Sequence, residues 1–204
     1  MSEVSAALVR DLRDKTGAGM MDCKRALSSC GGDLEKAVVY LREKGLAAAA
    51  KRSARAASEG AVGSYIHAGG KIGVLIEVNC ETDFVARTPE FQNLVKDLAM
   101  QVAAANPRCV SRDQVPSDTI KAERDIYRAQ ASGSGKPAQV IEKIVDGKLE
   151  KFFADSCLLE QAFIKDPQRT VTQLVSDVIA HLGENVIVRR FARFQLGELT
   201  ESAS

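Results

Sequence analysis

The sequence predicts an α+β fold in which a run of helices separates an early pair of strands from one late strand. Three observations predict this order. Apolar residues recur at helical spacing through the first 45 residues, strand-like alternation follows from 60 to 80, and alternation returns from 185 to 196. Helical spacing fills most of the chain in between. We therefore expect a three-stranded antiparallel sheet, built from the early hairpin and the late strand and packed by helices.

The composition is that of an ordinary globular protein with room for one sizeable domain, or for one domain and a small appendage. The chain has 204 residues, of which 45% are hydrophobic and 27% are charged, and its formal net charge is +1. So small a charge gives no general attraction to nucleic acid or to anionic membranes. No apolar stretch approaches the roughly 20 residues that cross a bilayer, and we expect no secretory signal at the N-terminus.

The five cysteines indicate a reducing, cytosol-like compartment. Their number is odd and none has C-x-x-C spacing, which argues against both a disulfide framework and a zinc site. Cys23 and Cys30 are seven residues apart, a spacing that fits the inner face of one helix, where free cysteine behaves as a small hydrophobe.

Three helices are expected in the first 45 residues. Ser5 is a suitable cap for the first helix, which ends at Gly17. The second helix spans 22–29. The third begins after the cap residue Asp33 and ends at Gly45. Together they form a small module whose core is barely large enough to stand alone.

An alanine-rich connector joins this module to the strands. Residues 46–59 have high helix propensity but few bulky side chains to bury, which indicates an exposed helical or flexible linker. Lys51, Arg52 and Arg55 could contact phosphates, although a solvated linker face explains them more simply. The predicted domains are accordingly the three-helix module (1–45), the linker (46–59) and an α+β core (60–204).

A hairpin opens the core domain. Residues 60–67 and 71–79 flank Ala68-Gly69-Gly70, which is a good hairpin turn. The late strand at 185–196 is expected to join this hairpin. The remaining helices are expected at 89–106, 118–131, 138–153 and 170–183, with Thr88-Pro89 and Thr170 as start signals and SGSG (132–135) as a break.

The stretch ETDFVART (81–88) connects the second strand to the next helix and places an acidic residue beside a bulky apolar one. Two explanations stay open from the residues alone. In the first, Thr82 or Asp83 satisfies local backbone donors and Phe84 packs beneath its own helix. In the second, the stretch contacts a partner.

The residue inventory argues against an enzyme, a cofactor site and a metal site. The two histidines, His67 and His181, have no plausible local metal partner, and the patterns G-x-S-x-G and H-E-x-x-H are absent. The stretch GSGK (133–136) fails as a phosphate-binding loop. Gln130 stands where the first glycine should be, and Pro137 replaces the magnesium-binding hydroxyl residue.

Two adjacent methionines follow the first helix, on the turn before the second. Methionine is usually core filler. Met20 and Met21 cannot both point inward from one turn, so we expect at least one of them to be offered to a partner.

Two segments, LVRDLRDKTGAGMMDCKRAL (8–27) and VNCETDFVART (78–88), closely resemble the signature segments of the translation elongation factor Ts family. Three more resemble its core, namely GSYIHAGGKIGVLIEV (63–78), SGKPAQVIEKIVDGKLEKFF (134–153) and ENVIVRRFARF (184–194). The likeness covers nearly the whole chain in the same order. Long matching segments spaced this widely are far more specific than a single short pattern.

The resemblance implies a function and a fold. Members of this family promote guanine-nucleotide exchange on the GTPase elongation factor Tu, without covalent catalysis and without a cofactor. They carry an N-terminal ubiquitin-associated-like three-helix module followed by an α+β core. The resemblance also implies a cytoplasmic protein of bacterial type, with an organelle matrix left open.

The resemblance further implies site residues. In the family, an Asp-Phe pair enters between helices of the GTPase domain near its magnesium and phosphate site. The matching positions are Asp83 and Phe84, with Phe84 as an apolar wedge and Asp83 as a competitor for polar groups. We call the segment that carries them the exchange loop: Thr82, Asp83, Phe84 and Val85. Arg13, Met20 and Met21 match an N-terminal contact with the GTPase, and His67 matches a core loop that contacts one of its distal domains.

The chain resembles a compact form of the family. Longer members have two core lobes, whereas this chain has strands for one. The strand at 185–196 is a poor one to leave uncovered in water, although its arginines could protect the edge. We therefore expect a homodimer, in which a second copy supplies the missing lobe.

A plain binding module is the rival interpretation. The three-helix module would then bind a ubiquitin-like protein, or Lys51, Arg52 and Arg55 would bind nucleic acid. Ubiquitin-type binding does not need the exchange loop, and nucleic-acid binding falls steeply with salt, whereas a wedge depends on apolar burial. We expect no direct contact with nucleic acid or with a membrane.

Overall fold

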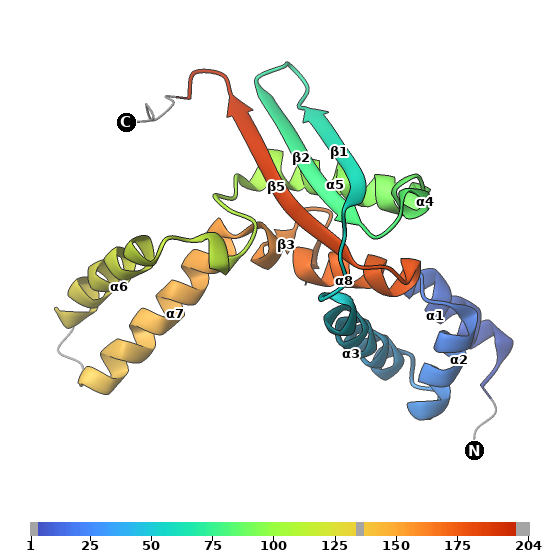
Figure 1. Cartoon of the computed structure of the whole chain (residues 1–204). Coiled ribbons are helices and arrows are strands. Elements are labelled where there is room, and N and C mark those ends of the chain that lie inside the picture. The colour runs from blue at the N-terminus through green and yellow to red at the C-terminus, as the bar shows by residue number, and fades with distance from the viewer. Residues whose placement is uncertain (1–3, 134–136, 199–204) are drawn as a thin grey trace. The chain divides into compact units, whose positions relative to one another are not determined.

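The computed structural model describes residues 4–133 and 137–198 and has the predicted α+β architecture (Figure 1). The predicted helices and strands are present and follow each other in the expected order. The α-helices are α1 (Ala6–Thr16), α2 (Met20–Ser29), α3 (Leu34–Arg52), α4 (Asp83–Ala86), α5 (Pro89–Ala105), α6 (Ser117–Ser132), α7 (Ala138–Ser156) and α8 (Val171–Leu182). The strands are β1 (Glu59–Ile66), β2 (Ile72–Cys80), β3 (Ala162–Phe163), β4 (Asp166–Thr170) and β5 (Val186–Gln195), and two short 3₁₀ turns are η1 (Arg112–Gln114) and η2 (Leu158–Glu160).

The chain divides into two compact units, and their boundary cuts across several elements. The first holds the described residues up to Ala61 together with Val78–Leu94 and Gln173–Ile187. The second holds Val62–Glu77, Val95–Thr172 and the described residues from Val188 onward. The division into domains at 45 and 59 stays a prediction. Part of the predicted break at 132–135 lies outside the described residues.

The first and third helices begin as the sequence predicts. The Ser5 hydroxyl accepts a hydrogen bond from the Leu8 amide at 3.3 Å, and α1 ends at Gly17, whose φ of 67° favours glycine. Asp33 caps α3 by accepting from the Lys36 amide at 3.0 Å. The three helices enclose a small apolar core of Val9, Leu12, Cys23, Ala26, Leu27 and Ala37.

Two predicted boundaries in this region were wrong. The second helix begins at Met20 instead of Asp22, so both methionines lie in its first turn and not on the preceding turn. The third helix does not end at Gly45 but continues to Arg52. Gly45 is buried, and a side chain there would point at Asp177 and Ala180 of α8. The missing side chain at Gly45 therefore allows α3 and α8 to approach closely, and α3 continues through this residue without a break.

The three-stranded antiparallel sheet has the order β1-β2-β5, so the late strand joins the early hairpin as predicted (Figure 1). The hairpin closes through a hydrogen bond from the His67 amide to the Ile72 carbonyl at 2.9 Å. On the other side of β2, the Leu196 amide donates to the Lys71 carbonyl at 2.8 Å. The inner face of β2 is buried, as its alternation predicts: Val74, Ile76, Val78 and Cys80.

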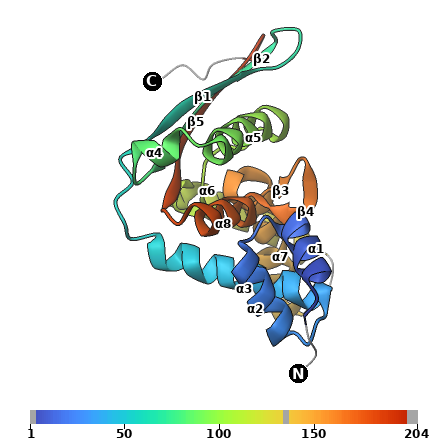
Figure 2. The same cartoon turned by 90° about the vertical axis from the view of Figure 1, so that its right-hand side faces the viewer.

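Helix α5 lies next to the sheet (Figure 2). It begins where the sequence predicts, because the Phe91 amide donates to the Thr88 hydroxyl at 3.3 Å. Gly63 of β1 allows the close approach of this helix, since a side chain there would overlap with Val95 of α5. The helix stops at Ala105, before Asn106, whose φ is 45°.

Helices α6 and α7 lie side by side as an antiparallel hairpin (Figure 1). Ion pairs link the two helices: Arg128 contacts Glu142 at 2.8 Å, and Arg124 contacts Asp146 at 3.0 Å. The sequence did not predict the small two-stranded sheet of β3 and β4 that follows. In the described part of the chain, no helix is long and apolar enough to cross a membrane.

Candidate functional site

The exchange loop begins with a tightly bonded threonine. Thr82 caps the single turn α4, and its hydroxyl accepts from the Val85 amide at 3.4 Å. The carboxylate of Glu184 accepts from the Thr82 amide at 3.0 Å and from the Thr82 hydroxyl at 2.7 Å. These bonds join the start of the loop to the residues just before β5. The loop is thus a short capped helix on a fixed base.

A second pair of contacts strengthens this base. The Asn185 amide donates to the Glu81 carboxylate at 2.6 Å, and the buried Asn185 side chain donates to the Arg55 carbonyl at 2.8 Å. The Cys80 thiol donates to the Thr82 carbonyl at 3.1 Å, and burial raises the pKa of this thiol. Neighbouring residues on both sides of Thr82 are therefore held in place.

The fixed base turns Phe84 outward. Its side chain is 80% exposed, whereas Val85 is half-buried and Ala86 is buried. The first of the two explanations left open by the sequence is confirmed in its local part, because the Thr82 hydroxyl accepts from the Val85 amide. Its other part, the packing of Phe84 beneath its own helix, is wrong. Leaving a phenylalanine ring in water forgoes about 1.5–3 kcal/mol of burial free energy. Such a ring on a rigid turn is suited to insertion into a partner.

Asp83 lies beside Phe84 and is held by a neighbour on the same short segment. Its carboxylate forms an ion pair with Arg87 at 2.8 Å, in which the Arg87 side chain is exposed and the Asp83 side chain is half-buried. Exposed ion pairs of this kind contribute only about 0–1 kcal/mol. Asp83 can therefore exchange Arg87 for a polar group of a partner at little cost.

The N-terminal site residues lie on two successive helices of the same unit. Arg13 is exposed near the end of α1, and Met20 and Met21 are 55% and 65% exposed at the start of α2. Both methionine side chains therefore face water, and the expectation that at least one of them contacts a partner stays a prediction. The core between these helices is filled by other residues, such as Leu12 and Cys23.

His67 belongs to the second compact unit and sits in the turn after β1. It is exposed, and its Nδ1 lies 3.0 Å from the Tyr65 hydroxyl. Within residues 4–133 and 137–198, no three His, Cys, Asp or Glu side chains gather as a metal-ligand set. The structure places His67 on an accessible hairpin tip, where a partner could contact it.

Glu81, Glu184 and Asn185 support the exchange loop but were not identified from the sequence. Glu184 and Thr82 are 102 positions apart, so no local pattern joins them. The one available signal was the polar pair Glu184-Asn185 directly before the apolar strand, in a segment that resembles the family core.

Comparison with known proteins assigns the family. The family described as Elongation factor TS matches residues 28–198. The Elongation factor Ts of Caldanaerobacter subterraneus subsp. tengcongensis is 60% identical over 195 residues, which cover 96% of this chain and 98% of that protein. The chain belongs to the elongation factor Ts family.

Other bacterial members of the elongation factor Ts family are similarly close. The Elongation factor Ts of Geobacter sulfurreducens is 61% identical over 96% of this chain and 90% of its own length. That of Desulforamulus reducens is 58% identical over 97% of this chain and 91% of its own length. The chain therefore spans nearly the full length of these relatives and is a translation elongation factor by family.

Proposed function

We propose that this chain is a guanine-nucleotide exchange factor for the GTPase elongation factor Tu, and that it acts by inserting the exchange loop near the magnesium and phosphate site. The observation that carries the proposal is the 80% exposed ring of Phe84 on a turn fixed by Glu184. An exposed ring on a rigid support loses little conformational freedom on binding, so most of its burial free energy goes into the complex.

In this mechanism Phe84 enters between helices of the GTPase domain as an apolar wedge. Asp83 leaves Arg87 and competes for polar groups that the nucleotide-bound arrangement uses. Thr82 and Val85 hold the turn, through the cap and through half-buried packing. No residue forms a covalent bond, and no cofactor takes part. The factor stabilises a conformation that holds magnesium and phosphate poorly, and bound nucleotide weakens the factor in return.

The N-terminal helices supply a second contact in this proposal. Arg13, Met20 and Met21 would meet another helix of the GTPase domain, as part of a ubiquitin-associated-like module. Flexible, polarizable methionine side chains adapt well to an apolar partner surface. His67 would contact a distal domain of elongation factor Tu from the tip of the β1–β2 hairpin.

The outer face of the sheet supports a homodimer as the working unit. Alternation puts the inner residues of β2 into the core and leaves four large apolar side chains exposed on the three strands: Val62, Ile66, Leu75 and Phe194. Gly73 lies on the central strand β2, between the two edge strands. The Ile66 side chain of β1 lies against the position that a side chain at residue 73 would occupy. A second copy of the chain would cover this face by two-fold symmetry.

The proposed place of action is the bacterial cytoplasm, where elongation factor Tu works.

The linker cations support a nucleic-acid site less well than the sequence alone allowed, because Arg55 forms an ion pair with Glu81 at 3.5 Å. That pair belongs to the base of the exchange loop. Arg55 therefore has a structural use in the folded chain.

The test of the exchange proposal is release of fluorescent GDP from elongation factor Tu. Catalytic amounts of the chain should speed release in the presence of excess unlabelled GDP, with no hydrolysis of nucleotide by the chain itself. The acceleration should persist at raised salt, because the proposed wedge depends on apolar burial. An unchanged release rate at saturating protein would overturn the proposal.

A further inference from the structure

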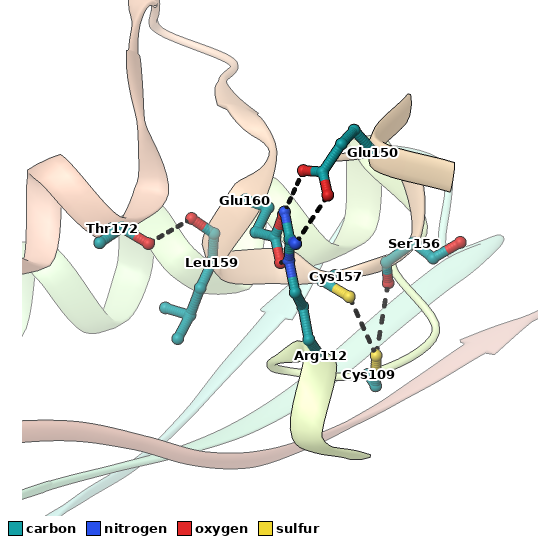
Figure 3. Close-up of polar contacts among 8 residues, drawn as sticks. All are labelled: Cys109, Arg112, Glu150, Ser156, Cys157, Leu159, Glu160 and Thr172. Atoms are coloured by element: carbon teal, nitrogen blue, oxygen red, sulfur yellow. Dashed lines mark hydrogen bonds and ion pairs between the residues drawn. The ribbon is translucent and has the colours of Figure 1, made fainter. Parts of the chain in front are cut away.

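Two thiols in the second compact unit lie against each other, outside the residues that the proposed exchange mechanism uses. Cys109 follows α5, and Cys157 directly follows α7, 48 positions later. The Cys109 thiol donates to the Cys157 sulfur at 3.6 Å and lies 3.8 Å from the Ser156 carbonyl oxygen. Figure 3 shows the two sulfur atoms facing each other.

Backbone hydrogen bonds hold the two cysteines side by side. The Leu158 amide donates to the Cys109 carbonyl at 2.9 Å, and the Cys109 amide donates to the Ser156 carbonyl at 3.3 Å. Flanking bonds join Arg108 to Ser156 and Leu159 to Val110. Cys109 and Cys157 are thereby paired as in a parallel bridge.

This pairing is compatible with the geometry of a disulfide. Neighbouring strands lie about 4.7–4.9 Å apart, and disulfides accept Cα separations of about 4.4–6.8 Å. A bonded pair of sulfur atoms is about 2.0 Å apart. The sulfur atoms of Cys109 and Cys157 therefore need to approach by a side-chain adjustment, without rearrangement of the backbone.

The two thiols differ in access. Cys157 is fully buried against Leu149 and Phe153. Arg112 covers this region by stacking its guanidinium 4.5 Å from the Phe153 ring centroid and by pairing with Glu150 and Glu160 (Figure 3). Cys109 is only half-buried. A small reagent would therefore reach Cys109 first.

Burial also limits the reactivity of Cys157. Burial raises the pKa of the Cys157 thiol. The thiolate is the attacking species in disulfide exchange, so Cys157 is a slow first nucleophile. Once Cys109 carries a leaving group, proximity makes Cys157 an effective second nucleophile.

We propose that Cys109 and Cys157 are a modification site that forms a reversible intramolecular disulfide with a low-molecular-weight disulfide, such as oxidised glutathione, as the oxidant. The Cys109 thiolate attacks one sulfur of the oxidant, the S–S bond of the oxidant breaks, and one thiolate leaves and takes up a proton. The Cys157 thiolate then attacks the Cys109 sulfur and releases the second thiol. Two protein thiols are oxidised, and one small disulfide is reduced to two thiols.

The crosslink would tie the ends of the segment that contains the α6–α7 hairpin. Closing a loop of this length restricts the unfolded chain, so the oxidised protein should be more resistant to heat. We expect the melting temperature to rise by about 5–10 °C. Dithiothreitol should return it to the value of the reduced protein.

The test treats the reduced full-length protein with oxidised glutathione under native conditions and maps its peptides by mass spectrometry. Trypsin separates the two cysteines, because Arg108 and Arg112 flank Cys109, and Lys151 and Lys165 flank Cys157. The expected product is one crosslinked peptide pair that has lost two hydrogens. It should disappear on reduction.

Two variants test the order of the steps, and a third serves the melting experiment. Cys157→Ser should trap a stable glutathione adduct on Cys109, and Cys109→Ser should leave Cys157 unmodified. Cys30→Ser serves as the background for the melting experiment, because Cys30 is the other half-buried cysteine of the described residues. Absence of the crosslinked pair in the folded wild-type protein, or its formation only in denaturant, would overturn the proposal even if a variant fails to fold.

Discussion

Thr82 and Glu184 are joined by two hydrogen bonds that span 102 positions of the sequence, one from the Thr82 amide at 3.0 Å and one from its hydroxyl at 2.7 Å. One carboxylate thus satisfies both donors of the residue that caps α4. Bonds to a charged acceptor contribute about 1.5–3 kcal/mol. The orientation of Phe84 depends on this contact, because Phe84 is the second residue of the capped turn.

Glu184→Ala is accordingly expected to slow exchange on elongation factor Tu about 10-fold while the protein stays folded. The loop loses its distant anchor, and ordering it on binding then costs conformational entropy. The measurement is GDP release together with amide hydrogen exchange of residues 82–87, which should become faster.

Thr82→Ser is the matched control for this prediction, because serine keeps the hydroxyl and the cap. It should retain most of the exchange rate, whereas Thr82→Val, of similar shape, should resemble Glu184→Ala. The interaction is refuted if Thr82→Val and Glu184→Ala combine additively in a double-mutant cycle.

Phe84→Ala is expected to reduce the exchange rate at limiting factor by about 10–100-fold, which corresponds to the 1.5–3 kcal/mol of ring burial in the complex. Its melting temperature should change little, because the ring is 80% exposed in the free protein. Ile126→Ala on α6, another exposed apolar residue, should leave exchange unchanged. A large loss of thermal stability in Phe84→Ala would instead place the ring in the core.

Local signals predicted the elements well, and contacts between distant residues explain the failures. Caps such as Ser5, Asp33 and Thr88 bond to amides three residues ahead, so a short stretch of sequence contains both partners. Gly45 failed as a helix end because its use depends on α8, more than a hundred residues later. A glycine commonly ends a helix by turning the backbone left-handed, as at Gly17.

The residues of the candidate site also differ in whether the sequence reveals them. Phe84 was found through resemblance, and its exposure was left open by the residues alone. Glu184 was missed because nothing near it in sequence reveals its partner Thr82. Outside the site, the buried pair Gln101 and Gln161, bonded at 3.1 Å, was missed for the same reason. The strands β3 and β4 were missed because β3 has only two residues and offers no alternation to detect.

Changing Met20 and Met21 together to alanine is expected to weaken binding to elongation factor Tu by about 5–10-fold, through lost apolar contact. The cost in thermal stability should be small, because both side chains are mainly in water in the free protein. Val39→Ala, an equally exposed residue of α3, is the control and should bind normally. Unchanged affinity together with a large drop in melting temperature would assign both methionines to packing.

Gly63→Ala is expected to destabilise the fold by about 1–3 kcal/mol, because the added methyl group would overlap with the Val95 side chain. Val95→Ala removes the obstructing methyl groups and should recover part of this loss in the double variant. Urea unfolding of the four proteins measures both effects. Equal stability of Gly63→Ala and the wild type would show that α5 shifts at no cost.

The last prediction is that two copies of the chain associate through the outer face of the sheet. Phe194 is 66% exposed on the edge strand β5, and Leu75 is exposed on the neighbouring strand β2. An ion pair between Arg190 and Glu77 at 2.7 Å joins the same two strands. An exposed apolar face on a short sheet favours association with a second copy. Phe194→Glu would place a charge in the centre of that contact.

Sedimentation equilibrium at micromolar concentration should give twice the chain mass of 21.9 kDa for the wild type and about the single mass for Phe194→Glu. Exchange should fall in the variant, because the second lobe then dissociates from the first. Ala192→Ser on the same strand is a control that should stay dimeric. A wild-type mass near 21.9 kDa with full exchange activity would refute the dimer and leave the exposed arginines of β5 as the protection of its edge.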